Sequence, residues 1–222
     1  MKPTIVTLIA VLAAATVAVS GAQAPAALAK DSPSLRQASP VAGESQAKVG
    51  EPAPNFTLDA LVGKESGKEF KKISLSDYRG KWVVLFFYPL DFTFVCPTEI
   101  KGFNEVLDAF RKLNAEVIGA SVDSKYAHLA WLQRGDLGNL KYPLLSDIRK
   151  EVAARYGILD EKEGVAQRGL FIIDPNGILQ YRLVHNLSVG RSVDETLRVL
   201  AALQTGELCP LGWKPGEKTL GK

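Results

Sequence analysis

The two cysteines of this chain, Cys96 and Cys209, are the side chains best suited to chemistry, because a thiolate is a nucleophile and two thiols can form a disulfide. Cys96 follows an unbroken apolar run at residues 82–87, which is typical of a strand buried on both faces of a sheet. After Cys96, Pro97 fits the first position of a helix, and apolar residues then recur every three or four positions, at Ile100, Phe103, Leu107 and Phe110. The pattern predicts a strand, a loop and a helix, with Cys96 at the helix N-terminus.

A helix N-terminus alone is a weak site for a thiolate. It stabilises an anion by roughly 0.3–1 kcal/mol, whereas a thiol that is ionised at neutral pH needs roughly 3 kcal/mol of differential stabilisation. A cation about 4 Å away contributes up to roughly 4 kcal/mol before desolvation. We therefore expect an arginine or lysine from a distant segment beside Cys96.

Composition narrows the class of protein. With 222 residues, 46% of them apolar, the chain is long enough for one globular domain with a substantial core. The formal net charge is only +3 and no basic stripe is interleaved with aromatic residues, which disfavours a nucleic-acid partner. The two histidines, His128 and His185, have no ligand spacing to a cluster of cysteines or carboxylates. We therefore expect neither a metal nor another cofactor.

The first 24 residues have the pattern of an export signal. Lys2 supplies a short basic start, residues 5–19 are mainly apolar, and residues 22–24 (AQA) form a cleavage pattern, with a second at 27–29. The apolar run is shorter than the roughly 20 residues of a membrane span. We expect a signal peptide at 1–24, a disordered linker at 25–47 and a mature protein in a bacterial periplasm. An uncleaved segment that tethers the protein to a membrane is the alternative.

From residue 48 onward the hydrophobic patterns predict an α/β domain. Residues 48–61 suit an extended entry and the charged run 64–72 a loop or hairpin. Further strands are expected at 82–87, 116–122, 168–174 and 178–184, and helices at 97 to about 113, 125–133, 150–156 and 194–204. Asn176-Gly177 is a strong hairpin signal between the last two strands. The order β-α-β-α-β-β-α predicts helices on both faces of a central sheet in a domain at 48–204, followed by a C-terminal arm at 205–222.

Several of these segments together resemble one protein family. Residues 89–99 (PLDFTFVCPTE) closely resemble the active-site signature of the typical two-cysteine peroxiredoxins. The resemblance extends, in order, to residues 125–131, 168–174, 189–196 and 209–219, and covers nearly all of 48–222. It implies a thioredoxin-like fold, with a central mixed sheet and helices on both faces, and a thiol-specific peroxidase activity.

The resemblance also implies roles for residues around the active site. Cys96 matches the peroxidatic cysteine, whose sulfenic acid is the intermediate, and Pro89 and Thr93 shape and hydrogen-bond its pocket. Arg168 matches the active-site arginine, and so supplies the expected distant cation. The arginine and the Thr93 hydroxyl are then placed to stabilise the thiolate and the charge that develops on the peroxide oxygens.

Three further residues have both a functional and a structural explanation. Glu99 and Arg191 match positions that the family uses as a polar network around the arginine. A first-turn glutamate is, however, also favoured by the helix dipole, and Arg191 could be a surface residue at a helix start. Trp131 either walls the active site or fills the core.

Cys209 matches the family's resolving cysteine, which comes from the C-terminal arm of a partner subunit. The implied cycle reduces hydrogen peroxide and organic hydroperoxides to water and alcohols. Cys96 becomes a sulfenic acid and condenses with Cys209 to form an intersubunit disulfide. A thioredoxin-like dithiol then reduces this disulfide to the two free thiols. The implied partners are the peroxide, thioredoxin or a thioredoxin-like reductant, and a second copy of the chain in a homodimer, with a decamer left open.

Family members that are sensitive to overoxidation resemble one another in a Gly-Gly-Leu-Gly loop and a C-terminal helix ending in Tyr-Phe. Here residues 135–138 read Gly-Asp-Leu-Gly, and the arm contains no Tyr-Phe pair. We expect disulfide formation by Cys209 to outrun further oxidation of Cys96 to sulfinic acid.

Other functions remain alternatives at this point. Two cysteines in an exported chain can form a structural disulfide. A thiol–disulfide oxidoreductase needs Cys-x-x-Cys, and position 99 is a glutamate. A cysteine hydrolase needs a histidine base, and nothing in the sequence places His128 or His185 beside Cys96. A holdase chaperone that works without peroxide could coexist with peroxidase activity.

Overall fold

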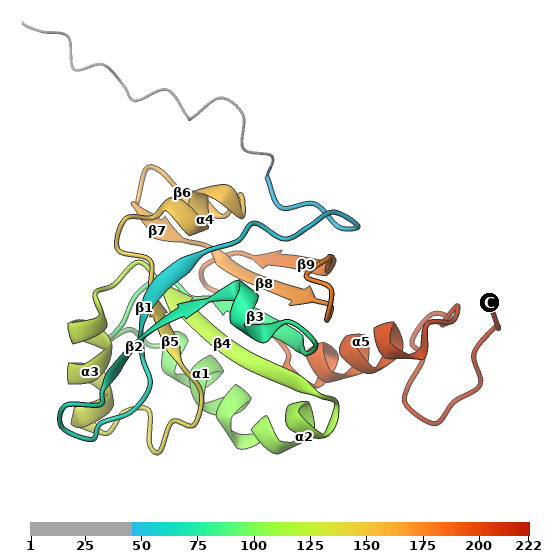
Figure 1. The fold of residues 1–222 in the computed structure, drawn as a ribbon, viewed down its shortest axis with the longest axis horizontal. Helices are drawn as coiled ribbons and strands as arrows, with labels where there is room; N and C mark the ends of the chain where they lie inside the picture. Colours follow the sequence, from blue (N-terminus) through green and yellow to red (C-terminus); the bar gives the residue numbers. More distant parts are fainter. Residues whose placement is uncertain (1–45) are drawn as a thin grey trace, which may run out of the picture. The chain divides into compact units, whose positions relative to one another are not determined.

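Strand β3 (Trp82–Phe87) lies in the interior of a seven-stranded mixed sheet in the computed structural model, which describes residues 46–222 (Figure 1). From edge to edge the strand order is β2-β1-β5-β4-β3-β8-β9. Strands β3, β4 and β5 run parallel to one another, and the neighbours on either side are antiparallel. A separate short hairpin pairs β6 with β7. The remaining strands are β1 (Thr57–Leu61), β2 (Phe70–Ser74), β4 (Ala115–Ser121), β5 (Leu144–Ser146), β6 (Leu159–Asp160), β7 (Val165–Ala166), β8 (Arg168–Ile173) and β9 (Leu179–His185).

The central strands form because their residues are apolar and buried on both faces. Every residue of β3 after Trp82 is buried, and so is every residue of β8. β8 and β9 are joined by the predicted turn, in which Gly177 has φ +79°. Asp174 Oδ1 accepts hydrogen bonds from the backbone N–H groups of Asn176 and Ile178, at 2.8 and 2.9 Å. The predicted hairpin is therefore confirmed.

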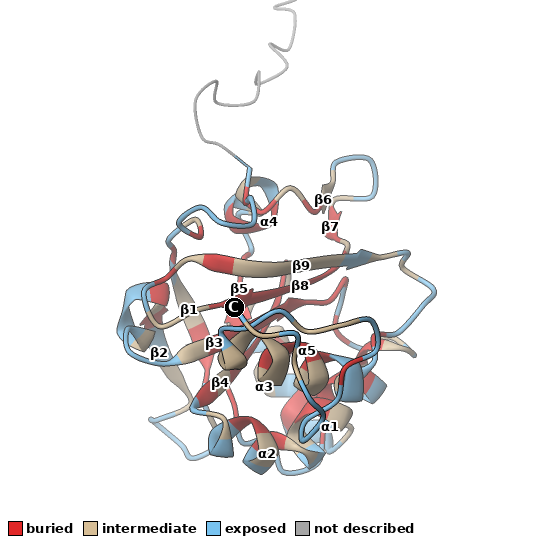
Figure 2. Ribbon diagram, turned by 90° about the vertical axis from the view of Figure 1, so that its right-hand side faces the viewer, coloured by how far each residue is buried: buried red, intermediate tan, exposed pale blue. Residues whose placement is uncertain are grey.

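Helices cover both faces of the sheet, as predicted (Figure 1). One face packs against α1 (Cys96–Glu105), α2 (Leu107–Lys112), α3 (Lys125–Arg134) and α5 (Val193–Thr205). The other face packs against the 3-10 helix η1 (Leu75–Tyr78) and α4 (Glu151–Arg155). Buried residues follow the central strands and form one core on each face (Figure 2). The predicted α/β architecture is confirmed.

Two local predictions are wrong. The helix predicted from 97 to about 113 is two helices, because the backbone at Val106 leaves the helical region (φ −104°, ψ 15°) before α2 begins. After this break, Leu107 and Phe110 are buried in the core that contains β4. Residues 144–146 were assigned to no element, because three residues are too few to show a periodicity. In the structure they form β5. The entry segment and the charged run pair as the hairpin of β1 and β2.

The predicted export signal and most of the predicted linker lie outside the described residues. Within residues 46–222, no helix is long and apolar enough to cross a membrane. Ala47, at the end of the predicted linker, is buried, and its N–H donates to the carbonyl oxygen of Arg155 at 3.1 Å. The contacts of the folded domain therefore already include residue 47.

Candidate active site

Cys96 is the first residue of α1, and Pro97 follows it in the first turn. Its side chain is fully buried, with a relative exposure of 0%. The backbone N–H groups of Thr98 and Glu99 donate to the carbonyl oxygen of Val95, at 3.0 and 3.3 Å, and so start the helix. The predicted strand–loop–helix arrangement is confirmed, and it places the thiol at the positive end of α1.

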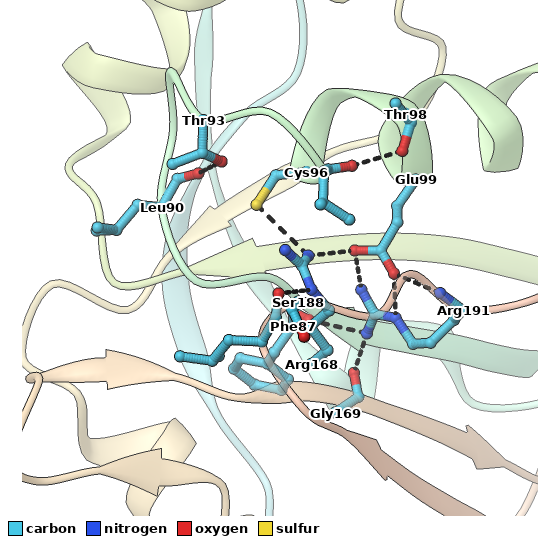
Figure 3. Close-up of polar contacts among 12 residues, drawn as sticks. Phe87, Leu90, Thr93, Cys96, Thr98, Glu99, Arg168, Gly169, Ser188 and Arg191 are labelled. Atoms are coloured by element: carbon cyan, nitrogen blue, oxygen red, sulfur yellow. Dashed lines mark hydrogen bonds and ion pairs between the residues drawn. The ribbon is translucent and has the colours of Figure 1, made fainter.

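Arg168 is the distant cation beside Cys96 (Figure 3). Its Nη1 lies 3.5 Å from Cys96 Sγ, and its side chain is buried. The sheet produces this contact, because β8 runs antiparallel to β3 with Leu170 opposite Phe86. Arg168, at the start of β8, therefore lies where β3 ends and the chain turns toward Cys96. Its Nε donates to the carbonyl oxygen of Leu187 at 2.7 Å, which fixes the guanidinium.

Glu99 joins the two arginines. Its Oε2 accepts from Arg168 Nη1 at 2.6 Å and Arg191 Nη2 at 2.8 Å, and its Oε1 accepts from Nε and the backbone N–H of Arg191, at 2.7 and 2.9 Å. Burial opposes ionisation, but the hydrogen bonds and charge of Arg191 and the charge of Arg168 lower the pKa of Glu99 below its usual value. Arg191 Nη1 donates to the carbonyls of Phe87 and Gly169, at 2.8 and 2.6 Å. Glu99 and Arg191 are both buried, so the surface explanation of Arg191 does not apply.

The loop between β3 and α1 is anchored at Asp91. One oxygen of this buried carboxylate accepts from the Tyr88 hydroxyl at 2.9 Å, and the other lies 2.7 Å from His128 Nδ1. The backbone N–H of Asp91 donates to Asp123 Oδ2 at 2.7 Å, and burial raises the pKa of Asp123. His128 Nε2 lies 3.1 Å from the carbonyl oxygen of Leu145, so His128 serves this anchor and not Cys96. Sequence reasoning missed the network, because Asp91 is more than thirty residues away from both Asp123 and His128.

Pro89 and Thr93 belong to the same loop. Pro89 is buried and Thr93 is half-buried. The Thr93 hydroxyl donates to the carbonyl oxygen of Leu90 at 3.0 Å (Figure 3). In this conformation the loop backbone, and not the Cys96 thiol, therefore holds the Thr93 hydroxyl.

Trp131 on α3 has both of the roles that the sequence left open. It is fully buried in the core. Its ring also lies 6.2 Å from Tyr88 and 5.7 Å from Phe92, measured between centroids, and Phe92 belongs to the loop that precedes Cys96. Trp131 therefore fills the core and contacts the active-site loop.

Cys209 is not part of this cluster. It lies beyond the end of α5, half-buried, with its Sγ 3.5 Å from Thr205 Oγ1 and 3.8 Å from the carbonyl oxygen of Ala202. Both cysteines are free thiols, so the alternative of a structural disulfide is not realised here. In Figure 1, α5 carries the arm away from the sheet. The structure thus brings together Cys96, Arg168, Glu99 and Arg191, but not Cys209.

The charges of the cluster are suited to stabilise one anion, such as a nucleophilic thiolate. Its two arginines and one glutamate leave one positive charge in excess, and this charge lies against the Cys96 sulfur. A thiolate there would balance the charge, and an oxygen developing negative charge next to it would meet the same guanidinium. Among residues 46–222, no three His, Cys, Asp or Glu side chains gather as a metal site would require.

Comparisons with known proteins agree with this chemistry. Residues 49–182 match the AhpC/TSA family. The chain is 55% identical over 183 residues to Peroxiredoxin-1 of Gallus gallus, covering 79% of this chain and 90% of that protein. The structure is similar to that of reduced 2-Cys peroxiredoxin of Plasmodium vivax (TM-score 0.72, 47% identity, 77% of this chain and 91% of the other). It is also similar to thioredoxin peroxidase I of Plasmodium yoelii (TM-score 0.63, 47% identity, 74% and 98%). The chain therefore belongs to the AhpC/TSA family and is a peroxiredoxin, a thiol-dependent peroxidase of the oxidoreductase class with a thioredoxin-like α/β fold.

Proposed function

We propose that this peroxiredoxin reduces hydrogen peroxide and organic hydroperoxides through Cys96, and that Cys209 of a partner subunit completes the cycle. The observation that carries the proposal is the contact between Cys96 Sγ and Arg168 Nη1, with Glu99 holding the arginine in place. A cation fixed against a thiol at a helix N-terminus is the arrangement that a nucleophilic thiolate needs.

In the first step, the Cys96 thiolate attacks the distal peroxide oxygen. A sulfur–oxygen bond forms, the oxygen–oxygen bond breaks, and the leaving oxygen takes a proton to become water or an alcohol. Cys96 is thereby oxidised to a sulfenic acid. Arg168 donates to the oxygens as the charge develops on them. The Thr93 hydroxyl donates a hydrogen bond to the carbonyl oxygen of Leu90 in the structure. It would become a second donor to the peroxide if it donated to a peroxide oxygen in place of this carbonyl.

In the second step, the Cys209 thiol attacks the sulfenic acid, which releases water and forms a disulfide. A disulfide requires Cα atoms within about 7 Å of each other. Arg191, which belongs to the Cys96 cluster, precedes α5, whereas Cys209 follows it. A helix of 13 residues spans about 20 Å. This separation favours a thiol from a second subunit, and a two-fold dimer would create two equivalent disulfides.

In the third step, a dithiol reductant of the thioredoxin type reopens the disulfide by exchange and leaves with a disulfide of its own. The thioredoxin peroxidase I to which the chain is similar supports this class of reductant. We also propose that residues 1–24 act as an export signal, and the reductant is then a thioredoxin-like domain in the periplasm.

The test is peroxide consumption coupled to a thioredoxin system, for the wild type, Cys96→Ser and Cys209→Ser. Cys96→Ser should consume no peroxide, and Cys209→Ser should consume one peroxide per subunit and then stop. Non-reducing gels of the peroxide-treated wild type should show a covalent dimer that dithiothreitol dissociates. Full turnover by Cys96→Ser would refute the role of Cys96, and an oxidised band of monomer size would refute the intersubunit bridge.

A further inference from the structure

The active-site loop must open during the cycle, and this consequence rests on the proposed Cys96–Cys209 disulfide. Cys96 is fully buried, so no second sulfur can reach bonding distance while residues 88–95 keep their present conformation. The start of the loop is held by the buried Asp91. Phe92 to Val95 lie between this anchor and Cys96, so opening of the loop depends on the contacts that hold these four residues.

Phe92 attaches this part of the loop to α3. Its ring lies 5.7 Å from the ring of Trp131 and 5.4 Å from the Cζ atom of Arg134, so it packs against two side chains of α3 while 46% of the residue stays exposed. Its backbone has φ +57°, a left-handed conformation that is unfavourable for a bulky residue unless its surroundings hold it. The next aromatic residue of the loop, Phe94, is 94% exposed.

Asp136 fixes both side chains that hold Phe92. Its Oδ2 accepts from Trp131 Nε1 at 2.9 Å and forms an ion pair with Arg134 Nε at 2.9 Å. Gly135 ends α3 with φ +96°, which turns the chain so that Asp136 faces back toward the helix. Trp131 is fully buried, so without Asp136 its N–H would lose this partner, and Arg134 would lose its anchor beside the Phe92 ring.

We propose that Asp136 is a positioning residue that latches the active-site loop: through Trp131 and Arg134 it retains Phe92 and so limits the rate at which Cys96 becomes accessible to Cys209. The latch affects which of two reactions the Cys96 sulfenic acid undergoes. The sulfenic acid either condenses with the Cys209 thiol and releases water, or reacts with a second peroxide to give sulfinic acid and water or an alcohol. A tighter latch favours the second reaction, because the sulfenic acid waits longer in the closed site.

Rapid mixing of the reduced protein with peroxide, followed by an acid quench, tests the latch in Arg134→Ala and Asp136→Ala. Non-reducing gels give the rate of disulfide formation, and intact mass gives the sulfinic acid per turnover. Arg134→Ala removes the cation–π contact with Phe92, so the loop should open more readily. Loss of such a contact at an exposed site corresponds to a roughly two- to fivefold faster disulfide step. Sulfinic acid per turnover should fall by a similar factor, while the rate of peroxide consumption in the first turnover stays unchanged.

Matched controls separate this role from a general loss of stability. Asp108 and Arg111 on α2 form another exposed ion pair, at 3.3 Å, and Asp108→Ala and Arg111→Ala should alter neither readout. Arg134→Ala keeps the hydrogen bond between Trp131 and Asp136, so it reports on the loop even if Asp136→Ala unfolds. Unchanged disulfide rates in Arg134→Ala, with a normal disulfide in the wild type, would overturn the latch. Absence of the disulfide in the wild type would instead overturn the proposed function.

Discussion

Replacing Glu99 by glutamine should destabilise the folded protein strongly, because Glu99 is the one negative charge between two buried arginines. The carboxylate accepts four hydrogen bonds, three from Arg191 and one from Arg168. Glutamine has nearly the same shape, but its NH₂ group would face guanidinium N–H groups and could not accept from them. Breaking a buried ion pair on one side costs about 3–5 kcal/mol. This loss is a large part of the roughly 5–15 kcal/mol that stabilises a typical domain.

The pH dependence of this loss follows from the lowered pKa of Glu99. Burial acts against the ionised form, but Arg191 and Arg168 outweigh it and place the pKa in the folded protein below the usual 4.5. A carboxylate with a lowered pKa contributes stability above its unfolded pKa, and this contribution is lost as the pH falls through the folded value. The difference in unfolding free energy between the wild type and Glu99→Gln should therefore be largest near neutral pH and shrink below about pH 4.5.

The assay is denaturant unfolding of the reduced proteins, followed by far-UV circular dichroism near neutral pH and again below pH 4.5. Glu105→Gln is the matched control, since Glu105 is an exposed glutamate at the end of the same helix. It should shift the unfolding free energy by no more than about 0.5 kcal/mol. If Glu99→Gln near neutral pH loses less than about 1 kcal/mol, or if its loss does not depend on pH, the ion-pair reasoning is refuted.

Three further predictions concern the peroxide step and export. Arg168→Ala should slow the reaction of Cys96 with peroxide by about 10²-fold, as for loss of one donor to a developing oxyanion, and Arg168→Lys should recover part of the rate. Stopped-flow kinetics of the peroxide reaction measure both rates, and an unchanged rate in Arg168→Ala would contradict the prediction. Thr93→Val should slow the same step and Thr93→Ser should restore it, whereas equal rates in both would assign Thr93 to loop structure alone. N-terminal sequencing of the protein from a periplasmic fraction should find a start near residue 25, and an intact Met1 in the cytoplasm would rule out the proposed export.

The parts of the fold that the sequence predicted well are those in which one pattern dominates. The apolar run of β3 and the Asn176-Gly177 turn each have a local cause, and both appear where expected. The cation beside Cys96 was also predictable, because a helix terminus stabilises a thiolate too little. Its identity as Arg168 came from the family resemblance, since only the register of β8 on β3 brings it to the sulfur.

The parts that were missed depend on tertiary contacts. Asp91 is within the signature, but nothing in the sequence pairs it with His128 or Asp123. The break at Val106 interrupts a helical apolar pattern that continues without change, so periodicity could not show it. Asp136 appeared as a deviation from a family loop, and only its distances to Trp131 and Arg134 show what the added carboxylate does.

The charges around Cys96 also link oxidation to opening of the loop. In the proposed cycle, a Cys96 thiolate would balance the one positive charge that Glu99 leaves unpaired on Arg168 and Arg191. Two opposite charges about 4 Å apart attract each other by roughly 4 kcal/mol near a protein surface. The sulfenic acid is neutral, so the first oxidation would remove this attraction and leave the packing of Phe92 and the hydrogen bonds of Asp91 to hold the loop. The reduced site is therefore held closed by charge as well as by packing and these hydrogen bonds, and the oxidised site by packing and these hydrogen bonds alone. Substitutions at Glu99 or Arg168 should then change the reaction with peroxide, whereas substitutions at Asp136 should change only what happens afterwards.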